Sequence, residues 1–273
     1  MIKKVLTIAG SDSGGGAGIQ ADIKTISALG CHASSVVTAI TAQNTLGVEA
    51  VEPLPAAWVE RQLRAVWDDI GADAVKIGML ATVELVEIVA ALLKTYRPPF
   101  VVLDPVLVAT SGDLLTGRSA AEAIAAELMP IATVITPNLP EAEQLTGLSV
   151  ASEEDYGAVW EAFRSRGARA LLLKGGHLTG DTLTDTLFTA EGHRSFTHDQ
   201  IDTRNTHGTG CTLSSALASY LARGYPLSRA AESAVAFTHR AIAAGRGRHI
   251  GAGHGPVDPF FRYRAAMNGE QTR

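Results

Sequence analysis

Short apolar runs alternate with longer amphipathic stretches along most of this 273-residue chain, and this alternation constrains the fold more than any other feature. Strands interleaved with helices are typical of a parallel β-sheet, because the chain must cross back over the sheet between two parallel strands and usually does so as a helix. The strand candidates are residues 5–9, 35–41, 48–53, 74–78, 100–103, 134–136 and 170–174. The sequence therefore predicts an α/β fold in which helices flank both faces of a central, mostly parallel β-sheet.

The remaining elements complete this prediction. Helical periodicity occurs at residues 19–29, 58–67, 82–96, 119–128, 140–145, 152–166, 211–221 and 228–244. Residues 185–189 and 195–197, joined around Glu191-Gly192, predict a small hairpin at an edge of the sheet. The sequence has no long Pro/Ser-rich linker and no repeat, so we expect one domain over residues 1–273.

Composition excludes several classes of partner. The net charge is -5 and no dense Lys/Arg run is present, which argues against binding nucleic acid or an anionic membrane. The sequence contains no run of about 18 apolar residues, so no membrane span is predicted. The two cysteines, Cys31 and Cys211, lie far apart in the sequence, which suits a reducing compartment. We therefore expect a cytoplasmic protein that acts on small molecules.

A glycine-bracketed turn, Asn-Thr-His-Gly-Thr-Gly-Cys at residues 205–211, runs directly into an apolar-periodic stretch. A helix start presents unpaired N–H groups and partial positive charge, and Gly208 and Gly210 allow a ligand to approach the main chain. Cys211 would lie where a helix dipole lowers the pKa of a thiol. The turn therefore predicts an anion pocket beside a nucleophile or base. The alternative is a tight turn with Cys211 as a small buried hydrophobe.

Polar side chains directly follow several strand candidates, at the edge where ligands bind in open α/β sheets. Each one alone could be a cap or a turn residue. Asp104 and Glu141 could hold Mg²⁺ directly or through water, and Lys174 could lie along a polyphosphate. The residues concerned are Asp12, Gln43, Asn44, Lys76, Asp104, Asn138, Glu141 and Lys174.

The glycine run at residues 14–18 fits neither classical nucleotide motif. No Gly-Lys-Ser/Thr follows it, and the Gly-x-Gly-x-x-Gly spacing is absent. The run could still let backbone amides approach a flat substrate.

Seven ordered blocks carry a resemblance that covers the chain from about residue 6 to residue 257. They read AGSDSGGGAGIQAD from Ala9, AQNT from Ala42, KIGM from Lys76, LDPV from Leu103, TPNLPEA from Thr136, KGGH from Lys174, and the Cys211 segment. With these blocks the chain resembles the hydroxymethylpyrimidine/phosphomethylpyrimidine kinases of thiamine biosynthesis, which belong to the ribokinase-like superfamily.

The resemblance implies a role for each matching position. Gln43 would hydrogen-bond an aminopyrimidine, and a carboxamide suits a ring nitrogen beside an amino group because it donates and accepts. Cys211 would be the catalytic base, beside the phosphate-stabilising residues Gly208, Thr209 and Gly210. Glu141 and Asp104 would organise Mg²⁺. The substrate pocket would be lined by Gly10, Asp12, Ala17, Met79 and Val106, and the nucleotide side by Asn138, Lys174, Thr206 and His207.

The resemblance further implies ATP as co-substrate, Mg²⁺ as cofactor and a homodimer. In the loop after Asp104, Leu107 and Thr110 stand where the family often has Met and Lys, which removes a cation there. Two alternatives remain: a pyridoxine/pyridoxal kinase of the same superfamily, and a non-catalytic pyrimidine-binding protein.

Overall fold

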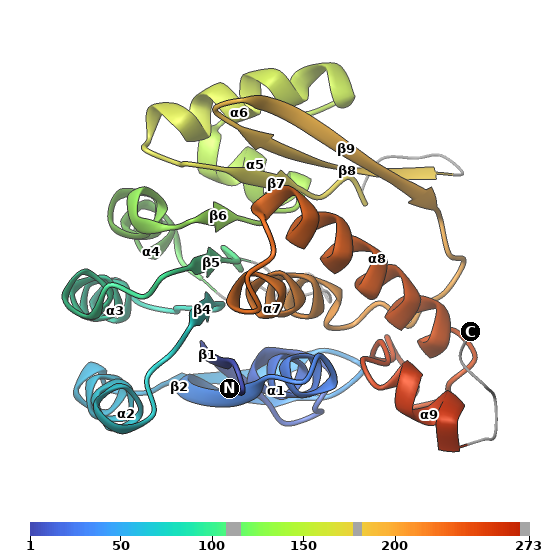
Figure 1. Ribbon diagram of the computed structural model, residues 1–273, viewed down its shortest axis with the longest axis horizontal. Coiled ribbons are helices and arrows are strands. Elements are labelled where there is room, and N and C mark those ends of the chain that lie inside the picture. Colours follow the sequence, from blue (N-terminus) through green and yellow to red (C-terminus); the bar gives the residue numbers. More distant parts are fainter. Residues whose placement is uncertain (108–115, 177–181, 268–273) are drawn as a thin grey trace.

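The computed structural model describes residues 1–107, 116–176 and 182–267, and within them nine strands form a single sheet (Figure 1). Thr110 and His177 lie outside the described residues. The strand order is β3-β2-β1-β4-β5-β6-β7-β8-β9. The strands are β1 Lys4–Asp12, β2 His32–Gln43, β3 Val48–Pro53, β4 Ala74–Ile77, β5 Val101–Leu103, β6 Val134–Ile135, β7 Leu171–Leu173, β8 Thr182–Thr189 and β9 Gly192–Asp199.

The six central strands run parallel, as the alternating pattern predicts. β1 pairs in parallel with β2 and β4, and parallel pairing continues through β5, β6 and β7. β3 is antiparallel to β2 at one edge, and the hairpin β8–β9 is antiparallel at the other edge. The predicted edge hairpin is confirmed, but its strands are longer than expected. The additional residues are exposed or half-exposed and form no apolar run, so the sequence pattern did not mark them as strand.

Helices cover both faces of the sheet, as Figure 1 shows. Helices α2, α3, α4, α5 and α6 pack on one face, and α1, α7 and α8 pack on the other. Their bounds are α1 Gly18–Ala28, α2 Ala56–Asp69, α3 Val83–Tyr96, α4 Arg118–Ala123, α5 Leu139–Thr146, α6 Tyr156–Ser165, α7 Thr209–Ala222, α8 Leu227–Gly245 and α9 Phe261–Met267.

Side-chain alternation along the strands builds the two cores. In β5, Val101 and Leu103 enter the core under α2–α6, whereas Val102 enters the core under α1, α7 and α8. Because the central strands are buried on both faces, most of their residues are apolar; Lys76 in β4 is an exception. Helix α7 is buried from Thr212 to Ala222, whereas its first three residues are part-exposed at the edge of the sheet.

Two local features differ from the sequence prediction. The expected helix at residues 119–128 continues as a π-helical turn, Ile124–Leu128, and a 3₁₀ turn, Met129–Ile131, where Pro130 removes a donor. Helix α9 was not predicted, because its seven residues are too few to show a clear period.

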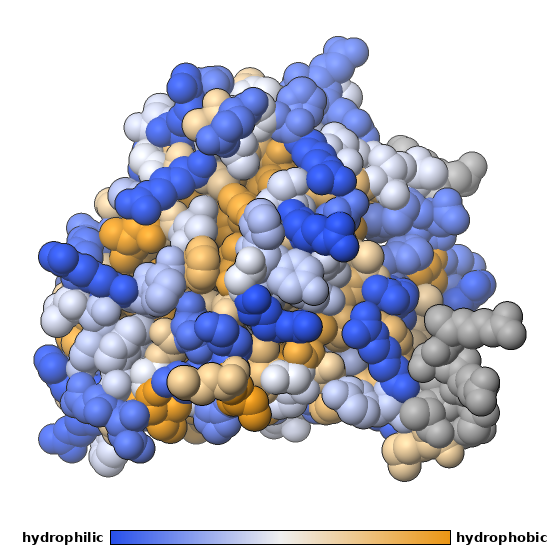
Figure 2. Space-filling model, viewed as in Figure 1, coloured by the Kyte–Doolittle hydropathy of each residue, from blue (hydrophilic) through white to orange (hydrophobic). Residues whose placement is uncertain are grey.

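The surface in Figure 2 is a mosaic in which hydrophilic residues separate small hydrophobic patches. In the described part of the chain, no helix has both the length and the apolar character needed to cross a bilayer.

Candidate active site

Three polar side chains that follow neighbouring strands meet at one edge of the sheet. Asp104 follows β5, Asn138 follows β6 and Lys174 follows β7. Lys174 Nζ donates to Asp104 Oδ1 over 3.2 Å and lies 3.8 Å from Glu141 Oε2. The predicted proximity of Asp104, Glu141 and Lys174 is therefore present in the structure.

Asp104 is buried, and its carboxylate accepts from three neighbours. Thr136 Oγ1 and Lys174 Nζ donate to Oδ1, and Ser214 Oγ of α7 donates to Oδ2 over 3.1 Å. Burial alone would raise the pKa of Asp104, but the ammonium groups of Lys174 and Lys76 outweigh it and lower the pKa below its usual value. Asp104 is therefore ionised at neutral pH.

Asn138 and Glu141 form the capping box of α5, a role that the sequence left open for isolated polar residues. The Asn138 side chain accepts from the Glu141 amide, and Glu141 Oε2 accepts from the Asn138 amide, both over 2.8 Å. The carboxamide oxygen of Asn138 is thus engaged within its own helix, whereas the predicted nucleotide contact would need its amino group.

Burial raises the pKa of Glu141 to about 7, because desolvation and the nearby Asp104 charge outweigh the attraction of Lys174. Two buried carboxylates thus share a single close ammonium group, so the cluster carries a residual negative charge when both are ionised. Oxygen donors with unbalanced charge suit a hard divalent cation. The residues present therefore fit Mg²⁺ held largely through water, since Lys174 already occupies the direct contact with Asp104.

We expect the free energy of unfolding of the wild-type protein, relative to Glu141→Gln, to fall as pH rises between about 4.5 and 7. The raised pKa makes the folded state bind a proton more tightly than the unfolded state over this range, so deprotonation destabilises the fold, by up to about 1.4 kcal/mol per pH unit. Urea unfolding with EDTA at several pH values would measure the difference. A difference that is constant with pH would contradict the raised pKa.

The start of α7 faces this cluster. A Cβ atom placed on Gly210 would lie 3.3 Å from Lys174 Nζ and 3.6 Å from Asp104 Oδ2. Thr209 caps the turn by donating from Oγ1 to the Thr206 carbonyl. Within the described part of the chain, the amides of Gly208, Gly210 and Cys211 have no hydrogen-bond partner. The structure thus places free amides at a helix N-terminus beside a lysine, an arrangement that suits an anion; the anion pocket itself stays a prediction.

Asp12 and His207 form a clamp between the two glycine segments. Asp12 accepts from the amides of Gly14, Gly16 and Ala17 and from His207 Nε2, the last over 2.9 Å. Burial would raise the pKa of Asp12, but the hydrogen bonds from His207 and Ala17 outweigh it and lower the pKa. The carboxylate of Asp12 and the ring of His207 thus hold the two glycine segments together, and the predicted binding roles of both residues stay predictions.

A buried ion pair, Lys76–Asp22, lies behind the first turn of α7, and the sequence analysis assigned it no role. Lys76 Nζ is 2.9 Å from Asp22 Oδ2, and neither side chain is exposed. Asp22 also accepts from Thr7 Oγ1 and from Ser215 Oγ, one turn after Cys211. The signal in the sequence is a lysine inside a fully buried strand, which requires a partner.

The expectation that the helix start lowers the pKa of the Cys211 thiol is wrong. Burial raises this pKa to about 12, and the charges of Asp22 and Asp104 add to the effect. Lys76 and a hydrogen bond from the Gly18 amide oppose the rise but do not overcome it. Cys211 keeps partial exposure and is a protonated thiol at neutral pH.

Of the residues predicted to line the substrate pocket, Gly10 lies near the end of β1, and Ala17, Met79 and Val106 lie in loops that follow strands. The main chains of Gly10 and Gly18 approach so closely that a Cβ on Gly18 would collide with the Gly10 carbonyl, and Met79 packs over Gly10. Ser13 exchanges hydrogen bonds with the backbone of Gln43, joining the glycine loop to the end of β2. The half-buried Gln43 carboxamide accepts from Thr41, and its amino group has no partner among the described residues. Ala17 and Val106 are part-buried. The amide of Ala17 donates to the Asp12 carboxylate, and the amide of Val106 donates to the Asp104 backbone carbonyl.

Comparison with known proteins gives one consistent result. The profile of the family described as phosphomethylpyrimidine kinase matches residues 12–258. The hydroxymethylpyrimidine/phosphomethylpyrimidine kinase of Rhizobium meliloti is 50% identical over 94% of this chain and 97% of that protein.

Two solved structures extend the comparison. The phosphomethylpyrimidine kinase of Clostridium difficile has a TM-score of 0.78 at 43% identity, over 88% of this chain and 99% of that one. The pyridoxal kinase of Staphylococcus aureus in complex with AMP-PCP and pyridoxal has a TM-score of 0.89 at 36% identity, over 97% and 96%. The chain thus has the expected ribokinase-like α/β fold, and it belongs to the phosphomethylpyrimidine kinase family.

Proposed function

We propose that the protein transfers the γ-phosphoryl group of ATP to the hydroxymethyl oxygen of 4-amino-5-hydroxymethyl-2-methylpyrimidine, and then a second phosphoryl group to the resulting monophosphate, in thiamine biosynthesis. One observation carries the proposal: the first turn of α7, where the amides of Gly208, Gly210 and Cys211 are unpaired among the described residues, lies against Lys174 and Asp104, because a Cβ on Gly210 would be 3.3 Å from Lys174 Nζ and 3.6 Å from Asp104 Oδ2. Phosphoryl transfer depends mostly on positioning and on stabilising charge, and this arrangement supplies both.

The donor side of the reaction would use the charged cluster. Lys174 would lie along the phosphates, and the α7 amides would stabilise charge on the migrating group. Glu141 and Asp104 would hold Mg²⁺ through water, and the cation would neutralise the leaving phosphates. Thr206 and the free amino group of Asn138 would contact the nucleotide. The AMP-PCP complex of the similar pyridoxal kinase supports ATP as the donor.

The acceptor side would use the loops around Gln43. Its amino group is free of partners among the described residues, so it can donate to a pyrimidine ring nitrogen. Gly10, Ala17, Met79 and Val106 would enclose the flat ring, while the clamp of Asp12 and His207 fixes the loop that carries Ala17.

Cys211 would receive the proton of the alcohol as the new O–P bond forms and the bond from phosphorus to the ADP oxygen breaks. With a pKa of about 12, the Cys211 thiol is almost entirely protonated at neutral pH. Only its small thiolate fraction can therefore act as the base. Lys76 is the group that opposes the raised pKa most strongly, and we propose that it supports this form.

We expect Cys211→Ala to slow the first transfer by about 10²-fold or more and the second transfer much less, because a phosphate monoester oxygen is already largely ionised. Separate single-turnover assays with the alcohol and with its monophosphate would measure both rates. Equal losses in the two steps would exclude Cys211 as the base for the alcohol.

Product analysis of purified protein with Mg·ATP tests the whole proposal. The pyrimidine alcohol, its monophosphate and pyridoxal would be supplied side by side. We expect the monophosphate and then the diphosphate of the pyrimidine. Phosphorylation of pyridoxal alone would favour the second candidate, a pyridoxal kinase, which the TM-score of 0.89 to that enzyme supports. Pyrimidine binding without ATP turnover would indicate a non-catalytic binding protein.

We further propose that the chain works as one catalytic domain, in the cytoplasm and as a homodimer, which the family resemblance supports. Light scattering after size exclusion should then give twice the chain mass of 28.6 kDa. A mass of 28.6 kDa at assay concentration would contradict the dimer.

A further inference from the structure

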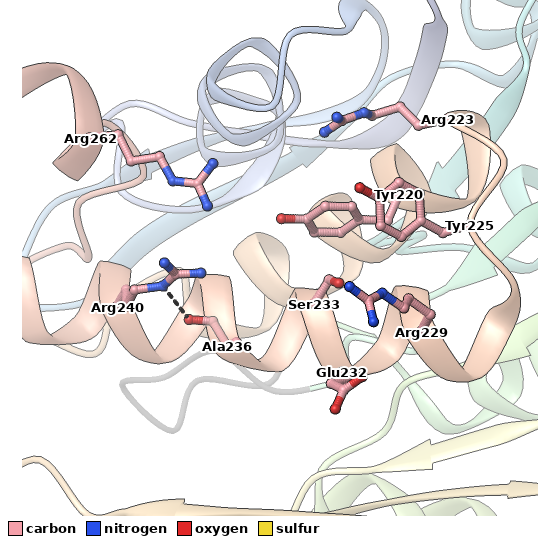
Figure 3. A pocket seen from close by; sticks show the side chains of 9 residues that line it. All are labelled: Tyr220, Arg223, Tyr225, Arg229, Glu232, Ser233, Ala236, Arg240 and Arg262. Atoms are coloured by element: carbon pink, nitrogen blue, oxygen red, sulfur yellow. Dashed lines mark hydrogen bonds between the residues drawn. The ribbon is translucent and has the colours of Figure 1, made fainter. Parts of the chain in front are cut away.

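A hollow of about 420 Å³ lies between the end of α7, α8 and α9, away from the site described above (Figure 3). We name it the arginine hollow, because four arginines and two tyrosines dominate its lining: Arg223, Arg229, Arg240, Arg262, Tyr220 and Tyr225. Tyr220 lies nine residues after Cys211 on α7, which is about 14 Å of helix rise. The arginine hollow is therefore distinct from the phosphate cluster at the start of this helix.

The charge in the arginine hollow is unbalanced. None of the four arginines has a carboxylate partner among the residues that the structure describes. The one acidic side chain in the lining, Glu232, is paired with Arg194 over 2.9 Å. In a protein of net charge -5, four guanidinium groups without a described carboxylate partner around one hollow concentrate positive potential at a single place.

Local interactions account for only part of this charge: Arg223 and Arg240 each donate to one backbone carbonyl, of Leu29 and Ala236. Arg229 lies in the first turn of α8, where a positive charge opposes the helix dipole. Hydrogen-bond donors are also unused: the hydroxyls of Tyr220, Tyr225 and Ser233 have no partner in the described part of the chain. Figure 3 shows the tyrosine hydroxyls and the guanidinium groups directed into the same space. A bound anion would satisfy both the charges and the donors.

The aromatic rings are not free to stack on a ligand. The guanidinium of Arg223 lies 5.7 Å from the centroids of both Tyr220 and Tyr225. Arg240 and Arg262 lie at 5.7 and 5.6 Å from the ring of Phe261. The hollow therefore offers guanidinium and hydroxyl donors rather than a surface for a nucleobase.

We propose that the arginine hollow is a second binding site, which takes a polyphosphate group. Two or more linked phosphates could reach arginines from α7, α8 and α9 together, and guanidinium groups recognise phosphate through paired N–H donors. The chemistry is that of a free polyphosphate or of the phosphate chain of a nucleotide, bound without recognition of the base.

Calorimetric titration with tripolyphosphate tests this proposal, using Lys174→Met to weaken the first phosphate site. We expect binding in Lys174→Met at low salt, and at least about a tenfold loss of affinity when Arg229→Gln and Arg240→Gln are added. Arg61→Gln, which removes an exposed arginine stacked on Trp58, is the matched control and should leave the affinity unchanged. Absence of binding in Lys174→Met, an unchanged affinity in the triple variant, or an equal loss in the control would each overturn the proposal.

A second arm distinguishes the sources of the phosphate group. ATP should bind Lys174→Met with an affinity within about threefold of that of tripolyphosphate, and inorganic phosphate should bind more weakly. ATP binding more than about tenfold tighter would overturn recognition through phosphates alone. Arg229→Gln/Arg240→Gln without the Lys174 change should keep its melting temperature and its phosphoryl transfer rate, which shows that a lost titration signal is not a loss of folding.

Discussion

Replacement of Gly208 by alanine is expected to reduce phosphoryl transfer by about 10²-fold or more. Gly208 has φ 80° at the N-cap of α7, and a Cβ atom there would collide with the Gly16 carbonyl oxygen. Left-handed strain accounts for about 1 kcal/mol, and the collision must in addition displace either the glycine loop or the start of α7. Both carry the proposed site, so a shift of even 1 Å moves the amides away from the phosphate.

The chain supplies a matched control for this substitution. Gly30 has φ 76° at the end of α1, and among the described residues no atom lies within 4 Å of the position of its Cβ. Gly30→Ala should therefore show the conformational strain alone, with a small loss of stability and normal transfer rates. Single-turnover rates and urea unfolding of both variants would separate the two effects. Equal loss of activity in Gly30→Ala would mean that global destabilisation, rather than misplacement of the α7 amides, explains the result.

Lys76→Met is expected to destabilise the protein by about 3–5 kcal/mol, because it leaves the Asp22 carboxylate buried without a counter-ion. Burial alone would lower the pKa of Lys76, but the charge of Asp22 outweighs it and raises the pKa, so the lysine is charged at all working pH values. Asp22→Asn in the same chain should recover part of the loss. Lys94→Met, which breaks the exposed pair Lys94–Glu127, should change stability by about 0–1 kcal/mol.

A second measurement tests whether Lys76 acts on Cys211. The rate of Cys211 alkylation by iodoacetamide against pH reports the pKa of the thiol, in a Cys31→Ala background. We expect Lys76→Met/Asp22→Asn to raise the pKa of the Cys211 thiol, because Lys76 lowers this pKa more than Asp22 raises it. The first phosphoryl transfer should then slow more than the second. If the variant has the same alkylation profile as the Cys31→Ala protein but a lower stability, the ion pair has only a structural role, in holding α1, α7 and β4 together.

Much of the fold follows from local patterns in the sequence. The buried parallel strand Val101–Leu103 is apolar at every position, and the edge hairpin is marked by Glu191-Gly192. The start of α7 was also predictable, because the N-cap residue has a left-handed backbone conformation that favours glycine, and Gly208 occupies this position. Such signals lie within a few residues of the structure that they specify.

The parts that could not be predicted depend on partners far apart in the sequence. Lys76 and Asp22 are separated by 54 positions, so neither residue alone shows that the other neutralises it. The raised pKa of Cys211 results from burial by surrounding elements, whereas the helix start that suggested a lowered value is a local feature. The pairing of Asp12 with His207, 195 positions away, likewise could not be predicted from either residue alone.

The clamp between Asp12 and His207 spans 195 positions of the chain. The loop at residues 14–18 emerges early during synthesis, but its anchoring imidazole emerges only after most of the sheet has been made. A nascent chain on the ribosome that ends before residue 207 would therefore hold an unfastened loop, and catalysis could begin only near the close of translation.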